Sequence, residues 1–184
     1  VQTCALPIYL EEAFHTRSIE EILADHPTAN LMIVEPDGST RVGAPGMHFP
    51  NGSVITPDGK TLIVGETMGF CLTAFDIAAD GSLSNRRVWA ALGGRIPDGI
   101  CLDADGQIWV ANPIANEVFR VREGGEVTEI VETTQPCFAC MLGGSDGKTL
   151  FALTAASSEE SIAGGSRTGK IETYRASAAG AGRP

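Results

Sequence analysis

The sequence predicts an all-β fold of the β-propeller class, with about three to three and a half four-stranded blades. Two observations carry this prediction. The 184 residues include 22 Gly and 10 Pro, a composition that suits many short strands joined by tight turns better than it suits helices. The chain also repeats a block of Pro, short apolar run, Asp-Gly turn and second apolar run, which is typical of propeller blades.

The repeated block appears three times, at Phe49–Val64, Ile96–Val110 and Pro136–Ala152. Pro50 and Pro97 are 47 residues apart, and Pro97 and Pro136 are 39 apart. Each Asp-Gly pair predicts a hairpin turn, because Gly tolerates a positive φ and Asp bonds its own backbone. The predicted strands, in chain order, are 52–56, 61–66, 71–77, 86–90, 99–102, 108–112, 117–122, 126–131, 138–141, 149–154 and 170–174.

The segments outside the three blocks are less regular. Residues 31–35 and 40–43, joined by Asp37-Gly38, resemble the outer hairpin of an earlier blade. Ser18–His26 combines helix formers with a Ser18/Glu21 capping pattern, and the alternative is a loop or strand remnant of a full propeller. Residues 157–168 indicate a mobile loop. We therefore expect an atypical segment over 1–29, a partial propeller domain over 30–176 and a disordered tail over 177–184.

The first residues, Val1–Ile8, lack an initiator Met and have neither the basic nor the long apolar part of a signal peptide. We expect this octet to be partly spurious and the chain to be truncated. A net charge of −10 without a basic cluster argues against nucleic-acid or anionic-membrane partners. Five cysteines at irregular spacings do not form a disulfide framework, which favours a cytoplasmic protein.

Candidate site residues stand just before the inner strand of each block, where a propeller opens its central channel: Asn51, Asp98 and Cys137. An amide oxygen and a carboxylate converging on one axis suit a hard divalent cation. The alternative is ordinary turn chemistry, since Pro-Asn-Gly and Pro-Asp-Gly are common turn sequences. Cys137 and Cys140 form a C-x-x-C, for which simple packing is favoured over a redox or zinc site.

Four blocks together resemble one family: FPNGSVITPDGKTLIVGET, LTAFDIAADGSLSNRRVWA, IPDGICLDADGQIWVAN and CFACMLGGSDGKTLFALTA. In this order they are similar to the senescence marker protein / gluconolactonase / luciferin-regenerating-enzyme family, also called the regucalcin family, over about residues 30–176. The resemblance implies a six-bladed propeller that holds one divalent metal, calcium, zinc, manganese or magnesium, and hydrolyses lactones, commonly sugar lactones.

By the same resemblance Asn51 and Asp98 are metal ligands, and Asp98 also accepts and donates the proton of the reaction. Such a metal would polarise the lactone carbonyl and activate a water. The family's third ligand, a Glu, and its substrate-orienting residues are expected upstream of this chain. The resemblance therefore implies a C-terminal part of the enzyme, weakly active by itself. The alternatives are a non-catalytic propeller that binds metal or a partner, and a phosphotriester hydrolase on the same frame.

Other polar residues carry weaker expectations. For Glu66 and Thr67 we favour a solvated strand end over a role in the site, and for His48 a surface position. Asp103 and Asp105 are expected to serve only their turn, and Trp89 and Trp109 to pack between blades.

Overall fold

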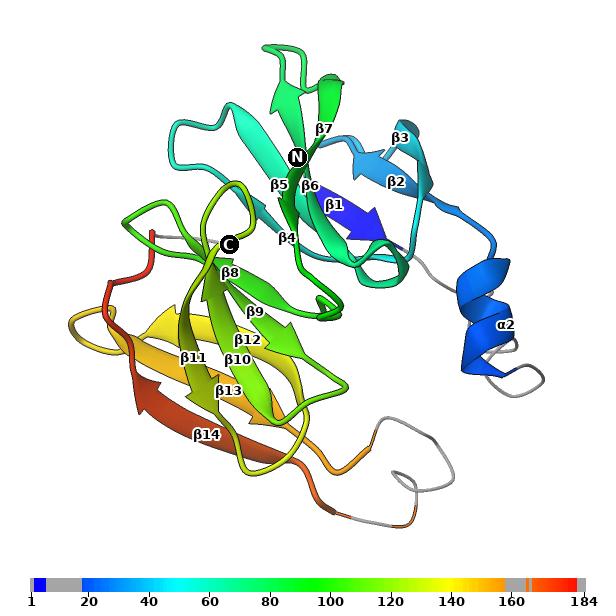
Figure 1. Cartoon of the computed structure of the whole chain (residues 1–184). Helices are drawn as coiled ribbons and strands as arrows, with labels where there is room; N and C mark the ends of the chain where they lie inside the picture. The colour runs from blue at the N-terminus through cyan, green and yellow to red at the C-terminus, as the bar shows by residue number, and fades with distance from the viewer. Residues whose placement is uncertain (1, 6–17, 158–164, 166, 182–184) are drawn as a thin grey trace.

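The architecture comes from a computed structural model, which describes residues 2–5, 18–157, 165 and 167–181. These residues form four antiparallel sheets, following one another along the chain (Figure 1). The first sheet is β1 (Gln2–Ala5), β2 (Ala29–Val34) and β3 (Thr40–Met47), in that order. The hairpin expected over 31–43 is thus confirmed as β2 and β3.

The second and third sheets each have four strands in sequential order. The second contains β4 (Pro50–Ile55), β5 (Thr61–Glu66), β6 (Cys71–Ile77) and β7 (Leu83–Ala91); the third contains β8 (Ile100–Leu102), β9 (Ile108–Asn112), β10 (Glu117–Val121) and β11 (Val127–Glu132). The fourth has three strands, β12 (Cys137–Gly143), β13 (Thr149–Thr154) and β14 (Lys170–Arg175). The all-β class is confirmed, and four of the predicted strands have the expected bounds.

The Asp-Gly turns behave as the sequence predicts. Gly59 has φ +70° and Gly106 has φ +75°, values in the left-handed region that favours glycine. The Asp58 carboxylate accepts hydrogen bonds from the Lys60 backbone and the Thr56 hydroxyl, so the turn is closed by its own side chains. Each turn therefore fixes the register of the two strands that it joins.

The sheets pack face to face, and the middle strands bury both of their faces. On β5, Leu62 and Val64 face the first sheet, whereas Ile63 faces the third. On β9, Ile108 and Val110 face the second sheet, and Trp109 and Ala111 face the fourth. This stacking explains why these strands read as continuous apolar runs, and it confirms that Trp109 packs between blades.

The inner strands β4, β8 and β12 contact one another through their backbones. The Gly52 N–H donates to the Asp98 carbonyl at 3.2 Å, and the Gly99 N–H donates to the Phe138 carbonyl at 3.0 Å. A Cβ on Gly52 would lie 2.6 Å from that Asp98 oxygen, and one on Gly99 would lie 2.7 Å from the Ala139 Cα. Glycine at both positions therefore permits the close radial arrangement of a propeller.

A short helix, α2 (Ile19–Ala24), precedes the first hairpin. Ser18 caps it, because the Ser18 side chain accepts from the Glu21 backbone while the Glu21 side chain accepts from the Ser18 backbone. The helical alternative for Ser18–His26 is therefore the one observed. Ile22 is buried and packs against Met68 and Phe49.

Two expectations for residues outside the strands need correction. The tail was expected to be disordered over 177–184, yet Gly180 bridges Asp103, and the Ala104 N–H donates to the Ala179 carbonyl at 2.7 Å. Ala178 is buried, so the tail gains contacts that its composition of mostly small residues did not reveal. Parts of three expected segments lie outside the described residues: Val1 and 6–8 of the first octet, most of the loop 157–168, and 182–184 of the tail.

Asp103 also does more than serve a turn. Its side chain is fully buried, accepts backbone hydrogen bonds from Asp105 and Gln107, and forms an ion pair with buried Arg120 at 2.7 Å. The half-exposed Asp105 pairs with the same guanidinium at 2.7 Å. The expectation that these two aspartates serve only their turn was therefore wrong. The sequence did not reveal their partner, because Arg120 comes from another strand, β10.

Candidate metal centre

Asn51 and Asp98 hold equivalent places in neighbouring sheets. Asn51 is the second residue of β4, and Asp98 precedes β8 by two residues. The backbone bond from Gly52 to Asp98 links the two segments directly, and the Asp98 N–H in turn donates to Ala111 on β9. The close approach at Gly52 thus brings the two candidate side chains together at one end of the inner strands.

The Asp98 carboxyl is half-buried and poorly compensated. Burial raises its pKa to about 6, against the opposing effect of hydrogen bonds from the Asn51 amide and the Gly99 backbone. Within the described residues, no ion pair reaches this carboxylate. A cation placed beside it would offset the cost of burying its charge.

Thr67 lies directly beside the pair, at the start of the short 3-10 helix η1 (Thr67–Gly69). Its hydroxyl donates to the Pro97 carbonyl at 2.8 Å, and it accepts from the Asn51 side-chain nitrogen at 3.2 Å. Thr67 is 7% exposed, so this hydroxyl is a buried bridge between the second sheet and the segment that carries Asp98. The expectation of a solvated strand end was therefore wrong for Thr67.

Cys137 occupies the equivalent place in the fourth sheet but offers a different chemistry. Its thiol is buried, and its sulfur lies 3.3 and 3.5 Å from the carbonyl oxygens of Ala139 and Leu153, which share its one proton. Burial raises the pKa of Cys137 to about 11, with a smaller contribution from the Asp98 charge. A neutral thiol is a poor ligand for a hard cation, and the nearby negative charge further disfavours the thiolate.

The rest of the C-x-x-C also packs rather than reacts. The Cys140 sulfur lies 3.9 Å from that of Cys101, and both side chains are buried as free thiols. This thiol contact and burial raise the pKa of Cys140 well above its usual value. The packing interpretation of Cys137 and Cys140 therefore agrees with their surroundings.

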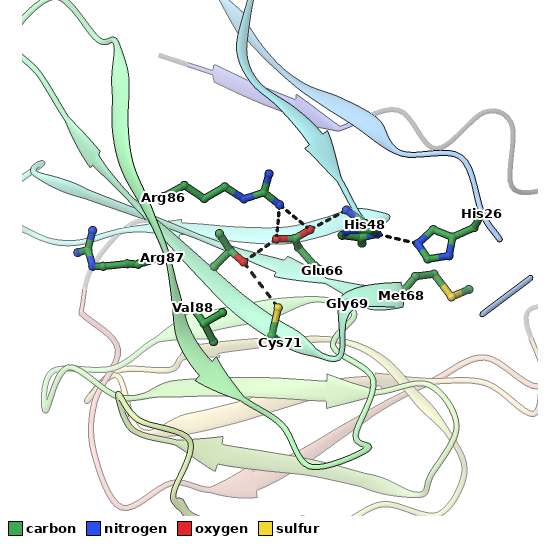
Figure 2. A pocket seen from close by; sticks show the side chains of 10 residues that line it. His26, His48, Glu66, Met68, Gly69, Cys71, Arg86, Arg87 and Val88 are labelled. Atoms are coloured by element: carbon green, nitrogen blue, oxygen red, sulfur yellow. Dashed lines mark hydrogen bonds and ion pairs between the residues drawn. The ribbon is translucent and has the colours of Figure 1, made fainter. Parts of the chain in front are cut away.

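A cavity of about 600 Å³ lies against the second sheet, where His26 and His48 also border it, and Glu66 is in its wall (Figure 2). Glu66 is 2% exposed, which overturns the expectation of a solvated strand end. Its carboxylate accepts from the Thr73 hydroxyl at 2.5 Å, from the His48 backbone at 2.6 Å and from Arg86 at 3.1 Å. Arg86 also donates to the Pro45 and Gly46 carbonyls of β3, so this cluster ties the two sheets together.

His48 borders the same cavity and is exposed, as expected. Its Nδ1 lies 2.9 Å from His26 Nε2 (Figure 2). His26 Nδ1 faces the Ile22 carbonyl at 3.0 Å, and because a carbonyl only accepts, that nitrogen carries a proton. The pair therefore attaches the end of α2 to β3.

Two of the candidate side chains offer oxygen atoms to a cation. Asn51 Oδ1 and the Asp98 carboxylate are oxygen donors of the kind that calcium, magnesium and manganese prefer. The described residues contain no group of three or more His, Cys, Asp or Glu that could hold a metal ion. Asn51 and Asp98 thus fit as two members of a larger oxygen donor set.

Comparison with known proteins defines the class. The chain belongs to the SMP-30/gluconolactonase/LRE-like family, whose model matches residues 14–156. Among curated relatives, it is 29% identical over 132 residues to regucalcin of Danio rerio, covering 69% of this chain and 45% of the relative. The chain thus spans about half the length of the curated relatives it matches.

Solved structures agree on the fold. A calcium-binding protein, regucalcin, from Agrobacterium tumefaciens superimposes with a TM-score of 0.68 at 21% identity, covering 87% of this chain and 56% of that one. A gluconolactonase from Xanthomonas campestris gives a TM-score of 0.58 at 28% identity, covering 70% of this chain and 42% of that one. The described helices are too short to cross a membrane.

Proposed function

We propose that this chain supplies Asn51 and Asp98 to the centre of a metal-dependent hydrolase of lactones, with sugar lactones as the substrate class. The observation that carries the proposal is the half-buried Asp98 carboxyl, which has no ion-pair partner among the described residues and whose backbone is hydrogen-bonded to Gly52, the residue after Asn51. Membership of a family that includes gluconolactonases supports lactones as the substrate class. The regucalcin relatives support calcium as one candidate cation, beside zinc, manganese and magnesium.

In the proposed reaction Asp98 is general base and then general acid. It takes a proton from the water whose oxygen bonds to the lactone carbonyl carbon, while the carbonyl electron pair moves to oxygen. The ring C–O bond then breaks, and Asp98 returns the proton to the ring oxygen, which gives a hydroxy acid. Asp98 suits this task because no ion pair among the described residues competes for its carboxylate.

A divalent cation held by Asn51 Oδ1 and Asp98, when bound, would supply positive charge beside the lactone carbonyl. The remaining ligands and the substrate-orienting residues are proposed to lie in parts of the protein beyond this chain. Because water would occupy the other coordination positions, we expect the 184-residue chain alone to bind metal weakly and to turn over lactones slowly.

The test is a lactone panel with calcium, zinc, manganese or magnesium, run on the 184-residue chain and on a longer form with the preceding blades. Asp98→Asn should lower turnover of the longer form by ~10²–10⁴-fold, the usual contribution of a general base. Glu123→Gln, which alters an exposed carboxylate in the turn after β10, is the control. Metal binding without turnover would favour a non-catalytic propeller, and cleavage of phosphotriesters in place of lactones would favour the third alternative.

A further inference from the structure

The buried Thr67 hydroxyl stands between the two candidate ligands and contacts both segments that carry them. It donates to the Pro97 carbonyl at 2.8 Å and receives the Asn51 amide nitrogen at 3.2 Å. Pro97 immediately precedes Asp98, whereas Thr67 follows β5 of the second sheet. One side chain therefore links the position of Asn51 to that of Asp98.

The proton count at Thr67 fixes the orientation of the Asn51 amide. A hydroxyl has one proton, and a carbonyl oxygen can only accept, so the Thr67 proton goes to Pro97. Only lone pairs of Thr67 then remain to face Asn51. The amide atom opposite them must be the NH₂ nitrogen, since the amide oxygen would meet another oxygen with no proton between them.

The amide nitrogen of Asn51 is engaged by Thr67, so Oδ1 is the amide atom that remains for another partner. A hard cation binds such an oxygen and never an amide NH₂.

We infer that Thr67 is a positioning residue: its hydroxyl selects the Asn51 orientation that presents Oδ1 to a divalent cation, and it holds Asn51 beside Asp98. The inference rests on the proposed function, because it assigns Thr67 to the same centre. Residues that orient metal ligands through hydrogen bonds typically change metal affinity by ~10–100-fold when removed. A purely structural Thr67 would instead affect folding alone.

Three variants separate these roles. Thr67→Val removes the hydroxyl at nearly constant volume, and Thr67→Ser keeps it. Thr73→Val is the matched control, because Thr73 is another buried threonine of the second sheet, 3% exposed, whose hydroxyl donates to Glu66. Both valine variants lose one buried hydroxyl, but only Thr67→Val changes the contacts of Asn51.

The first measurement needs no metal. In ¹H–¹⁵N spectra of the chain, Thr67→Val should shift the Asn51 side-chain amide resonances and speed their hydrogen exchange, since one of the two N–H groups loses its acceptor. Thr67→Ser should restore the wild-type positions, and Thr73→Val should leave them in place. Unchanged Asn51 resonances in Thr67→Val would overturn the inference.

The second measurement is a Ca²⁺ titration of the same variants made in the longer form with the preceding blades. We expect Thr67→Val to weaken binding by about 10-fold or more, with Thr67→Ser and Thr73→Val within about threefold of the wild type. If Asn51→Ala and Asp98→Asn weaken binding but Thr67→Val does not, only the role of Thr67 fails. If neither ligand variant changes the titration, or the wild type shows no saturable binding at millimolar Ca²⁺, the cation centre itself fails.

Discussion

Glu66 and Asp98 are two carboxylates at the same end of the second and third sheets, and their surroundings differ sharply. Glu66 is almost fully buried, yet Arg86, the Thr73 hydroxyl and the His48 backbone all donate to it. Asp98 is less buried but has no ion-pair partner among the described residues, and burial raises its pKa to about 6. A fully compensated carboxylate joins sheets together, whereas an uncompensated one has capacity left for a cation or a proton.

The largest expected effect on stability concerns Glu66, the carboxylate with several hydrogen-bond donors. Glu66→Gln should lower the free energy of unfolding by about 2 kcal/mol, because the new amide NH₂ would face the donors of Arg86. Urea denaturation at pH 7 measures this. The control is Glu35→Gln, which alters the more exposed Glu35–Arg41 pair and should cost below about 1 kcal/mol. Equal losses in the two variants would contradict the structural role assigned to Glu66.

The second prediction concerns Asp98, whose substitution should raise the free energy of unfolding. The raised pKa of Asp98 means that the folded state disfavours its charge, so metal-free protein loses stability as pH rises from about 4 through about 6. Asp98→Asn removes that loss and should stabilise the metal-free chain by about 1 kcal/mol at pH 8, because water still reaches the half-buried group. At pH 4 the variant and the wild type should unfold alike. Destabilisation at pH 8 would show that Asp98 is already compensated.

The smallest effect involves a third carboxylate, Glu172 on β14. Burial alone would raise its pKa, but hydrogen bonds from Tyr174, Thr154 and Thr134 outweigh burial and lower the pKa to about 2. Glu172→Gln should therefore cost about 0.5 kcal/mol at pH 7, since neutral donors favour the charged form. That difference should persist down to about pH 4.5 and disappear as pH falls toward 2. Denaturant midpoints across this range measure it, and a pH-independent difference would contradict the assignment.

Local patterns predicted most of the strands. The bounds of β5, β6, β9 and β13 agree with the sequence because each strand begins or ends beside an Asp-Gly turn, whose chemistry is contained in a few neighbouring residues. The adjacency of Asn51 and Asp98 also followed from the repeat, since equivalent positions in successive blades lie side by side. Their roles as ligands remain predictions.

Long-range partners account for what the sequence did not reveal. Glu66 was expected at the surface because its hydrogen-bond donors are not adjacent to it in the sequence. Arg86 and Thr73 lie on other strands, and the hairpins bring them beside Glu66. The buried Asp103–Arg120 pair likewise joins a turn to β10. Thr67 showed no signal beyond its position after a strand, because its hydroxyl bonds to the Pro97 carbonyl in the segment before β8, which is distant in the sequence.

The glycines at the inner strands separate the framework of the centre from its chemistry. Gly52 and Gly99 join neighbouring sheets through main-chain hydrogen bonds that do not depend on the adjacent side chains. The residue preceding each glycine can therefore vary without disturbing the scaffold: an amide at Asn51 and a carboxylate at Asp98. Such a modular arrangement would let selection, or an engineer, change the proposed cation centre one blade at a time.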